Sequence, residues 1–355
     1  MIRRAPGSSS GNRVIAGSGA GRRTIDYLRI SITDRCNFRC RYCMPQEGIH
    51  PVSHDDILSF EEIVRVATAA VDAGVSRVRI TGGEPLVRRG CVDLIEQLAM
   101  IPGVSDLSLT TNGSLLESQA VELRAAGLSR INISIDSLDG ERFSRITGGG
   151  DLALVMAGLD SALDAGFAPV KVNAVALEGI EDDLAGFVAM TRERPVHVRF
   201  IEFMPIGWRL GEADPGGRRP SDVRSGDRQL SSGPWKFVPR ARLLAGLAAF
   251  GELRPVASPG GGGPARYFKF RGAEGTIGFI SSMSDHFCSR CNRLRLTADG
   301  RLRNCLFSDE ETDIRPHIGG DRTELTRIIF DSMNSKKFSR TGVRPGARTM
   351  SQIGG

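Results

Sequence analysis

Three cysteines lie close together near the start of the chain. Cys36, Cys40 and Cys43 are spaced four and three residues apart in one short segment. Because cysteine thiolates are the usual ligands of iron–sulfur clusters, this spacing indicates such a cluster. A cubane cluster normally takes four ligands, so three cysteines leave one iron with an open position for a substrate or cofactor. A structural zinc site that borrows a distant fourth ligand is the alternative.

A second group of three cysteines lies near the other end of the chain. Its members are Cys288, Cys291 and Cys305. This group also lacks a fourth cysteine, so a second iron–sulfur cluster and a zinc knuckle with His286 as fourth ligand are both open. Arg293 and Arg295 follow at alternating positions. On a strand, both guanidinium groups would point to one face and suit a phosphate chain, unless that face is simply solvated.

The composition favours an ordinary globular protein. The chain has 355 residues, of which 40% are hydrophobic and 25% charged, which leaves room for two or three domains. No apolar run approaches the roughly 18 residues of a membrane span, and seven cysteines are too few for a disulfide framework. The lone Cys91 falls in a helical pattern and is interpreted as a core residue. The net charge of +6 suggests a polyanionic partner, either nucleic acid or nucleotide phosphate.

The cysteines must be positioned by a repeating alternation of strands and helices. Short apolar segments predict strands over 27–33, 77–81, 106–110, 130–136, 169–175 and 196–203. Between them lie helical patterns such as 60–73, which Ser59 and Glu62 open as a capping box. The repeat implies an α/β fold with parallel strands, either a partial (β/α)6 barrel similar to a TIM barrel or a doubly wound sheet. In both folds the ligand site lies at the carboxyl ends of the strands.

Three polar segments fall at those strand ends. They are Thr-Gly-Gly-Glu-Pro at 81–85, Thr-Thr-Asn-Gly at 110–113 and Ser-Ile-Asp at 134–136. Together with the cysteine loop, which has Tyr42 before its last cysteine, they resemble the radical S-adenosylmethionine (SAM) enzymes. The resemblance implies that the open iron of the first cluster binds SAM. One electron then cleaves SAM to a 5′-deoxyadenosyl radical, while the protein orients the reactants.

Several cations lie on the predicted strands. They are Arg29, Arg77, Arg79, Lys171 and Arg199, in addition to Arg293 and Arg295. Arg77 and Arg79 alternate and therefore share a face of their strand. Because buried cations need a compensating charge, an inward-facing group of this kind requires an anionic ligand. Each residue taken singly is more commonly a surface cation, but seven on converging strands favour an anion site.

Within the radical SAM enzymes, the chain resembles the GTP 3′,8-cyclases of molybdenum-cofactor biosynthesis. The segments that carry this resemblance are 28–45, 79–89, 109–113, 199–205, 287–307 and the terminal Gly354-Gly355. The resemblance implies two [4Fe-4S] clusters, one held by Cys36, Cys40 and Cys43, and one held by Cys288, Cys291 and Cys305. The residues implied to line SAM are Tyr42, Gly83, Ser134 and Met204. Those implied to bind GTP are Arg29, Arg77, Arg79, Thr110 (or Thr111), Lys171, Arg293, Leu294 and Arg295. Arg199, Gly354 and Gly355 are implied to act in catalysis with the first three cysteines.

The implied reaction removes the 3′ hydrogen from the ribose of GTP. The carbon radical then adds to C8 of guanine and gives 3′,8-cyclo-7,8-dihydro-GTP, the first step of molybdenum-cofactor (molybdopterin) biosynthesis. The implied partners are GTP, an electron donor similar to flavodoxin or ferredoxin, the cyclic pyranopterin monophosphate synthase that acts next, and a second copy in a homodimer. Neither nucleic acid nor a membrane is an expected partner. The terminal Gly354-Gly355 pair, which in an arbitrary protein would be a frayed end, is expected to thread into the cavity.

Four regions are expected along the chain. They are a basic tail (1–24), the partial barrel (25–206), an insertion rich in Gly, Arg and Ser (207–233), and a C-terminal α+β extension with the second iron–sulfur site (234–355). In the extension we expect helices over 240–250 and 323–335 and strands over 266–271, 276–281, 292–297 and 301–305. The tail has too few large apolar residues for a mitochondrial transit peptide, and Met1 opens no secretory signal, so a cytoplasmic location is expected.

Two other functions stay open at this point. A radical enzyme that matures peptides with auxiliary clusters would need more than three cysteines in the second half and no ring of cations. A nucleic-acid-binding protein with zinc knuckles would need aromatic side chains interleaved with basic ones, yet only 6% of residues are aromatic. Iron content would separate the cyclase from the zinc protein.

Overall fold

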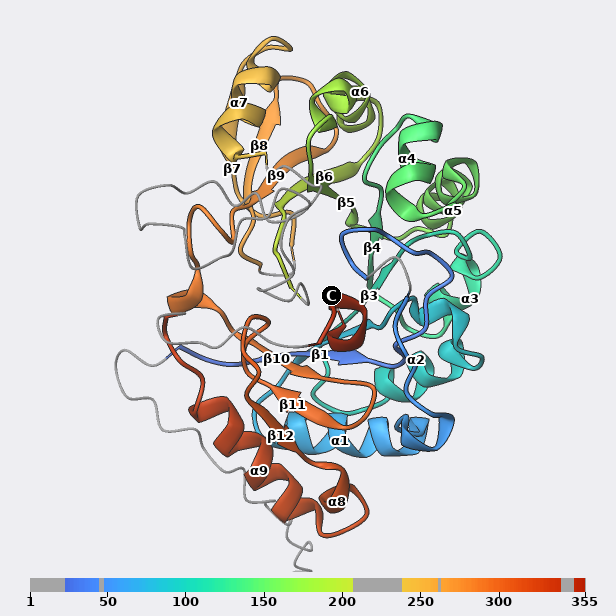
Figure 1. Ribbon diagram of the computed structural model, residues 1–355, viewed down its shortest axis with the longest axis vertical. Coiled ribbons are helices and arrows are strands. Elements are labelled where there is room, and N and C mark those ends of the chain that lie inside the picture. The colour runs from blue at the N-terminus through green and yellow to red at the C-terminus, as the bar shows by residue number, and fades with distance from the viewer. Residues whose placement is uncertain (1–22, 45–47, 207–237, 261–262, 340–347, 355) are drawn as a thin grey trace, which may run out of the picture.

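The core of the protein is an arc of parallel strands. The computed structural model describes residues 23–44, 48–206, 238–260, 263–339 and 348–354. In chain order the arc contains β1 (Tyr27–Ser31), β2 (Arg77–Thr81), β3 (Asp106–Thr111), β4 (Arg130–Ser134), β5 (Val170–Ala176) and β6 (Val196–Glu202). Because each strand pairs with the next one along the chain and the order never reverses, the arc is a partial barrel and not a doubly wound sheet. Figure 1 shows it curving around a central space.

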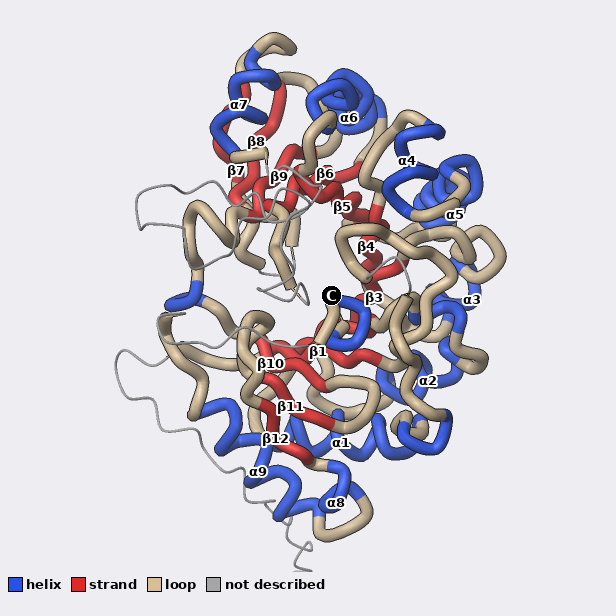
Figure 2. The backbone as a smooth tube through the Cα atoms, in the orientation of Figure 1, coloured by secondary structure: helices blue, strands red, loops and turns tan. Residues whose placement is uncertain are grey.

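The helices that connect these strands lie on the outer face of the arc (Figure 2). They are α1 (Phe60–Asp72), α2 (Cys91–Ala99), α3 (Ala120–Ala125), α4 (Gly140–Thr147), α5 (Leu152–Asp164) and α6 (Leu184–Glu193). The predicted capping box is present at α1, where the Ser59 hydroxyl accepts from the Glu62 N–H and the Glu62 carboxylate accepts from the Ser59 N–H. Cys91 is a buried core residue, as predicted. No helix in the described part of the chain is long and apolar enough to span a membrane.

The two faces of the arc differ in chemistry. On β1, Leu28 and Ile30 are fully buried in the hydrophobic core. The alternate residues Tyr27 and Arg29 line a central cavity instead. This alternation with a period of two is the ordinary property of a strand, and it turns polar and charged side chains toward the interior of the barrel.

The C-terminal half continues the same sheet at both ends of the arc. Strand β10 (Arg293–Leu296) pairs in parallel with β1, and β9 (Thr276–Ile280) pairs in parallel with β6. The complete order is β12-β11-β10-β1-β2-β3-β4-β5-β6-β9-β8-β7. The other elements of this half are β7 (Leu253–Val256), β8 (Arg266–Phe270), β11 (Arg301–Arg303), β12 (Glu311–Asp313), α7 (Arg240–Ala248), α8 (Arg315–Ile318) and α9 (Arg322–Asn334). The expected extension therefore builds no sheet of its own, and the expected insertion at 207–233 lies outside the described residues, as do residues 1–22 of the expected tail.

The end of the chain returns to the interior of the barrel. The short turn η6 (Met350–Ile353), red in Figure 1, lies inside the arc of strands. Thr349 and Gln352 close this turn with a second capping box. The other single-turn helices are η1 (His54–Asp56), η2 (Pro85–Val87), η3 (Ile180–Asp183) and η5 (Cys288–Arg290).

Candidate active site

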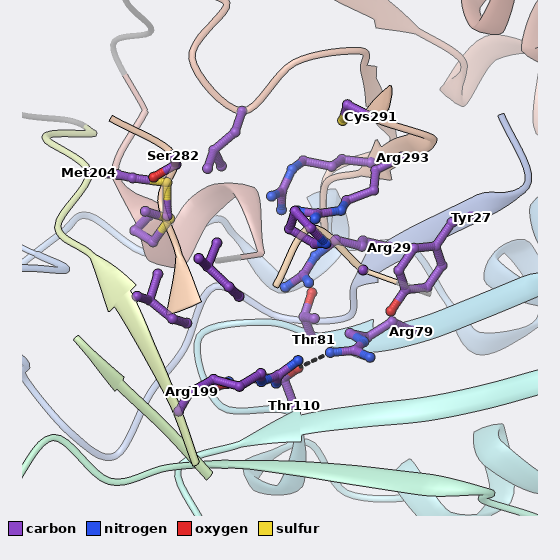
Figure 3. A pocket seen from close by; sticks show the side chains of 18 of the residues that line it. Tyr27, Arg29, Arg79, Thr81, Thr110, Arg199, Met204, Ser282, Cys291 and Arg293 are labelled. Atoms are coloured by element: carbon purple, nitrogen blue, oxygen red, sulfur yellow. Dashed lines mark hydrogen bonds between the residues drawn. The ribbon is translucent and has the colours of Figure 1, made fainter. Parts of the chain in front are cut away.

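A cavity of about 350 Å³ lies inside the barrel and brings the two halves of the chain together. Both cysteine triplets line it. The strand register places Arg295 of β10 beside Arg29 of β1, and Arg29 beside Arg79 of β2. Three guanidinium groups thus stand in one row across three neighbouring strands. In Figure 3, Arg29, Arg79 and Arg293 extend into the same space.

The first cysteine loop packs directly against the glycine segment that follows β2. The Gly83 N–H donates to the Thr33 carbonyl oxygen at 2.7 Å. A Cβ atom at Gly83 would lie 2.4 Å from the Arg35 carbonyl oxygen, a distance that no side chain allows. The predicted Gly-Gly segment is therefore explained by the close approach of two backbones, which fixes the cysteine loop over the carboxyl end of β2.

Burial dominates the surroundings of the first three thiols. It raises the pKa of Cys36 to about 11 and that of Cys43 to about 12, and it raises the pKa of Cys40 well above its usual value. Asp136 adds to the effect at Cys40, and its carboxylate accepts a hydrogen bond from the Tyr42 hydroxyl at 2.7 Å. Thiolates at these positions need positive charge from a bound metal centre.

The donor set of the first loop fits an iron–sulfur cluster. Cys36, Cys40 and Cys43 are free thiols that line the same cavity. Thiolates are the usual ligands of such clusters, and three of them leave one iron of a cubane open. The first loop therefore suits three ligands of a [4Fe-4S] cluster.

The residues expected to line SAM all lie on the cavity wall. They are Tyr42, Gly83, Ser134 and Met204. Ser134 is the last residue of β4, and Met204 follows the end of β6, so both come from the carboxyl edge of the sheet. This agrees with the edge at which the sequence places the ligand.

Glu84 ties the glycine segment to the end of β3. Its carboxylate accepts hydrogen bonds from the Thr111 hydroxyl at 2.8 Å, the Asn112 N–H at 2.6 Å and the Leu86 N–H at 3.0 Å. Burial nevertheless raises the pKa of Glu84 to about 7. Because Thr111 is occupied by Glu84 while the Thr110 hydroxyl accepts from Arg79 at 3.4 Å, Thr110 is the threonine that faces the cations.

Cations surround the second cysteine triplet. Burial raises the pKa of Cys291, but Lys336 and Arg293 outweigh it and bring the pKa below its usual value. The Lys336 ammonium donates to the Arg293 carbonyl oxygen at 2.8 Å and also to the carbonyl oxygen of Asn304. It therefore joins the two chain segments that carry Cys291 and Cys305.

Two further residues define this second region. The Arg23 guanidinium donates to the Cys288 carbonyl oxygen at 2.6 Å, so the start of the described chain contacts the second triplet. His286, the fourth ligand of the zinc alternative, lies with Nδ1 2.8 Å from the Ser282 carbonyl oxygen and is not part of the cavity wall. The three thiols line the cavity, whereas His286 does not.

The cations on the strands are crowded and buried. Burial, followed by repulsion from Arg199, lowers the pKa of Lys171 to about 6. Burial also lowers the pKa of Arg199 and Arg295 to about 10. Such groups are stabilised when a polyanion is placed among them. The cavity wall is thus suited to a triphosphate.

Two expected GTP-binding residues are placed differently. Arg77 shares a face with Arg79, as predicted, but it lies at the start of β2, pairs with Asp26 and is not part of the cavity wall. Leu294 lies on the opposite face of β10 from Arg293 and is fully buried in the hydrophobic core. The same alternation that turns Arg293 and Arg295 inward must turn Leu294 outward.

Other wall residues were missed in the sequence. They include Tyr27, Arg130 and Asn173. Each lies two or four residues from an expected site residue on the same strand: Tyr27 from Arg29, Arg130 from Ser134, and Asn173 from Lys171. Extending the period of two along each strand would have found all three.

The end of the chain closes the site. The Gly354 carbonyl oxygen accepts from Arg295 at 2.7 Å and from Arg29 at 3.4 Å. Gly354 has φ of 67°, and a Cβ atom there would lie 2.5 Å from the Thr81 hydroxyl oxygen. Glycine is therefore required at this position. Gly355 lies outside the described residues.

Comparison with known protein families and structures identifies the class of protein to which the chain belongs. The radical SAM superfamily matches residues 30–189, and the Molybdenum Cofactor Synthesis C family matches residues 196–341. The crystal structure of SuiB from Streptococcus suis bound to S-adenosylmethionine is similar in fold, with a TM-score of 0.57 and 14% identity over 85% of this chain and 65% of that chain. The chain is a radical SAM protein, a class that uses a [4Fe-4S] cluster and SAM.

Comparison with proteins of similar sequence identifies one family within this class. The chain is 46% identical over 343 residues to the GTP 3′,8-cyclase of Pelotomaculum thermopropionicum, covering 94% of this chain and 98% of that protein. It is 45% identical over 339 residues to the GTP 3′,8-cyclase of Moorella thermoacetica, with the same coverage. The chain belongs to the GTP 3′,8-cyclase family of molybdenum-cofactor synthesis.

Proposed function

We propose that this protein converts GTP into 3′,8-cyclo-7,8-dihydro-GTP. The observation that carries the proposal is the row of Arg295, Arg29 and Arg79 on the wall of a cavity that both cysteine triplets also line. A triphosphate bound along this row neutralises the buried cations and keeps the rest of the nucleotide between the two triplets.

The first triplet would hold one [4Fe-4S] cluster and the second triplet another. When bound, the first cluster would supply the electron for reductive cleavage of SAM, and the 5′-deoxyadenosyl group would then take the 3′ hydrogen of GTP. Tyr42, Gly83, Ser134 and Met204 would line SAM. The closeness of the Gly83 backbone to the cysteine loop holds SAM at the carboxyl edge of the sheet, where its reactive carbon can face the ribose.

The cations would bind and orient the substrate. Arg293, Arg295, Arg29 and Arg79 would hold phosphate oxygens through charge-assisted hydrogen bonds, and Lys171 would add a point charge. Thr110 sits beside Arg79 and would give a hydroxyl to the same ligand. Arg199, whose guanidinium donates to Asn132 at 2.8 Å, would act close to the reacting ribose. Arg77 and Leu294 would act at most through their positions in the strands.

The terminal glycines would complete the site. With its carbonyl oxygen on Arg295 and Arg29, Gly354 orients two of the phosphate-binding guanidinium groups. Gly355, which lies outside the described residues, is proposed to act with Gly354, and it has no reactive side chain. Outside the cavity, the proposed partners are an electron donor similar to flavodoxin or ferredoxin, the cyclic pyranopterin monophosphate synthase that takes the product, and a second copy of the chain, all in the cytoplasm.

An anaerobic reaction tests the proposal. Reconstituted protein is incubated with SAM, dithionite and GTP that carries deuterium at the ribose 3′ carbon, and the products are separated by chromatography and weighed by mass spectrometry. We expect a cyclised nucleotide together with 5′-deoxyadenosine that contains the deuterium, and about eight irons per chain. Unlabelled 5′-deoxyadenosine without a cyclised nucleotide would contradict the proposal, and stoichiometric zinc without iron would favour the nucleic-acid-binding alternative.

A further inference from the structure

Arg348 pairs with two carboxylates at the base of the C-terminal segment. Arg348 donates from its two terminal nitrogens to both carboxylate oxygens of Asp299, at 3.0 and 2.8 Å. It also donates to Glu311 at 3.0 Å, and its Nε lies 2.8 Å from the other oxygen of Glu311. A planar guanidinium paired in this way with two carboxylates is fixed in direction as well as in position.

The socket for this arginine belongs to the sheet itself. Asp299 lies in the turn between β10 and β11, and Glu311 opens β12. Burial raises the pKa of Asp299, but the hydrogen bonds from Arg348 outweigh it and bring the pKa below its usual value. Burial acts against the charge of Arg348 as well, yet its bond to Asp299 raises the pKa of the guanidinium. Both partners are therefore ionised, and the position of Arg348 follows that of the strands that carry the arginine row.

The segment beyond Arg348 reaches both parts of the site. Met350 and Ser351 line the cavity together with Cys43 of the first triplet. Three residues later, the Gly354 carbonyl oxygen lies against Arg295 and Arg29. Since η6 is closed by its own capping box, residues 349–354 behave as one short unit. A displacement of Arg348 would therefore move both Ser351 and Gly354.

We propose that Arg348 is a positioning residue for the radical reaction, because its pairing with Asp299 and Glu311 keeps residues 349–354 inside the barrel. The catalytic part of this inference rests on the proposed function of the cavity. The structural part, that Arg348 sets how often the C-terminal segment leaves the barrel, does not. Arg348 touches neither triplet and acts only through the segment that follows it.

The variant Arg348→Gln removes the charge and keeps a hydrogen-bonding side chain of similar reach. The matched control is Arg322→Gln, because Arg322 makes an equivalent two-point pair with Asp72 at 2.6 and 2.8 Å on the exposed surface of α9. Amide hydrogen exchange of the peptide that covers 348–355 is followed by mass spectrometry, with the peptide from β1 as internal reference. The measurement is made on the anaerobic holoprotein with and without GTP.

We expect at least tenfold faster exchange of the C-terminal peptide in Arg348→Gln, unchanged exchange in β1, and a comparable fall in the yield of cyclised nucleotide per 5′-deoxyadenosine. Arg348→Lys should recover part of both, and Arg322→Gln should match the parent protein in both. Unchanged exchange of the C-terminal peptide in Arg348→Gln would overturn the inference. Faster exchange with full product yield would overturn the positioning role. The hydrogen-exchange measurement does not require turnover. It therefore shows whether Arg348 holds the C-terminal segment even if the protein acts on a substrate other than GTP.

Discussion

The two cysteine triplets line one cavity but lie in opposite electrostatic surroundings. Around Cys36, Cys40 and Cys43, burial raises the pKa of every thiol, and carboxylates such as Asp136 add to the effect. Around the second triplet, Lys336 and Arg293 lower the pKa of Cys291 in spite of burial. One group of three thiols thus lies in an apolar, slightly acidic environment, and the other lies among cations.

This difference separates two tasks. Positive charge near an iron–sulfur cluster raises its reduction potential, and an apolar or acidic setting lowers it. The first region is therefore suited to give an electron away, which reductive cleavage of SAM requires. The second region is suited to hold an anion, because Lys336 and Arg293 place positive charge beside its thiols. The predictions below test this division.

Removal of one cysteine from each triplet should give the largest contrast. Cys40→Ala should abolish 5′-deoxyadenosine formation altogether, because the first cluster then loses one of three ligands. Cys291→Ala should retain some 5′-deoxyadenosine formation but yield no cyclised nucleotide, because radical generation does not require the second region. Both products are quantified by chromatography. Cys91→Ala, which removes a buried core thiol that is not part of the cavity wall, serves as control, and full product from Cys291→Ala would break the division of tasks.

Deletion of Gly354 and Gly355 tests whether the two regions work as one site. The deletion removes the carbonyl group that Arg295 and Arg29 share but leaves both triplets intact. We expect normal iron content and an unchanged melting temperature, together with loss of cyclised nucleotide. Turnover at the parent rate, measured by chromatography of the product, would show that the two regions need no link through the end of the chain.

Loss of a cation in the second region should have an intermediate effect. A charge-assisted hydrogen bond contributes about 1.5–3 kcal/mol, so Arg293→Gln should weaken GTP binding by about ten- to a hundredfold in calorimetry. Guanosine, which lacks the phosphates, should bind almost equally to both proteins. Arg295→Gln should weaken GTP binding by a similar factor. An equal loss for guanosine and GTP would mean that the arginines are structural, and Arg327→Gln on the exposed face of α9 is the matched control.

Among these predictions, the change of GTP affinity with pH should be the smallest effect. Burial and Arg199 lower the pKa of Lys171 to about 6, so Lys171 is neutral at pH 8 in the free protein. A bound triphosphate favours the charged form and raises that pKa, so GTP binding takes up a proton. Affinity should therefore fall as pH rises above about 6, by at most tenfold per pH unit. Calorimetry in buffers of different ionisation enthalpy measures the uptake, and Lys171→Met should abolish it; equal uptake in that variant would assign the proton elsewhere.

The strands and the chemistry at their ends could be predicted because both depend on local patterns. All six strands of the arc were predicted, with ends that differ from the observed ones by at most two residues, since short apolar runs bounded by turns define them. The Gly-Gly segment was recognised from its motif. Its physical reason, the approach of the Gly83 backbone to Arg35, becomes visible only in three dimensions.

The closure of the sheet could not be predicted from local patterns. Tyr27 of β1 pairs with Arg293 of β10, which lies far from it in the sequence. A periodic pattern within one segment does not predict which distant segment pairs with it. The same limit applies to Arg77, whose guanidinium pairs with Asp26 of another segment. Leu294 differs, because the period of two along β10 already places it on the face opposite Arg293. Arg348 was missed for a related reason, because both of its carboxylate partners come from other strands and turns.

The pairing of β10 with β1 and of β9 with β6 also affects the risk of aggregation while the chain is being synthesised. While the ribosome is still making the second half, the arc of parallel strands exposes β1 and β6 as unpaired edges, which are templates for aggregation. In the finished fold those edges are covered, and the outermost strands are β7 and β12. Strand β7 carries Pro255, and β12 is three residues long with Glu311 and Asp313 at its ends, features that discourage further pairing. The C-terminal half thus covers both edges of the N-terminal arc, in addition to supplying the second triplet.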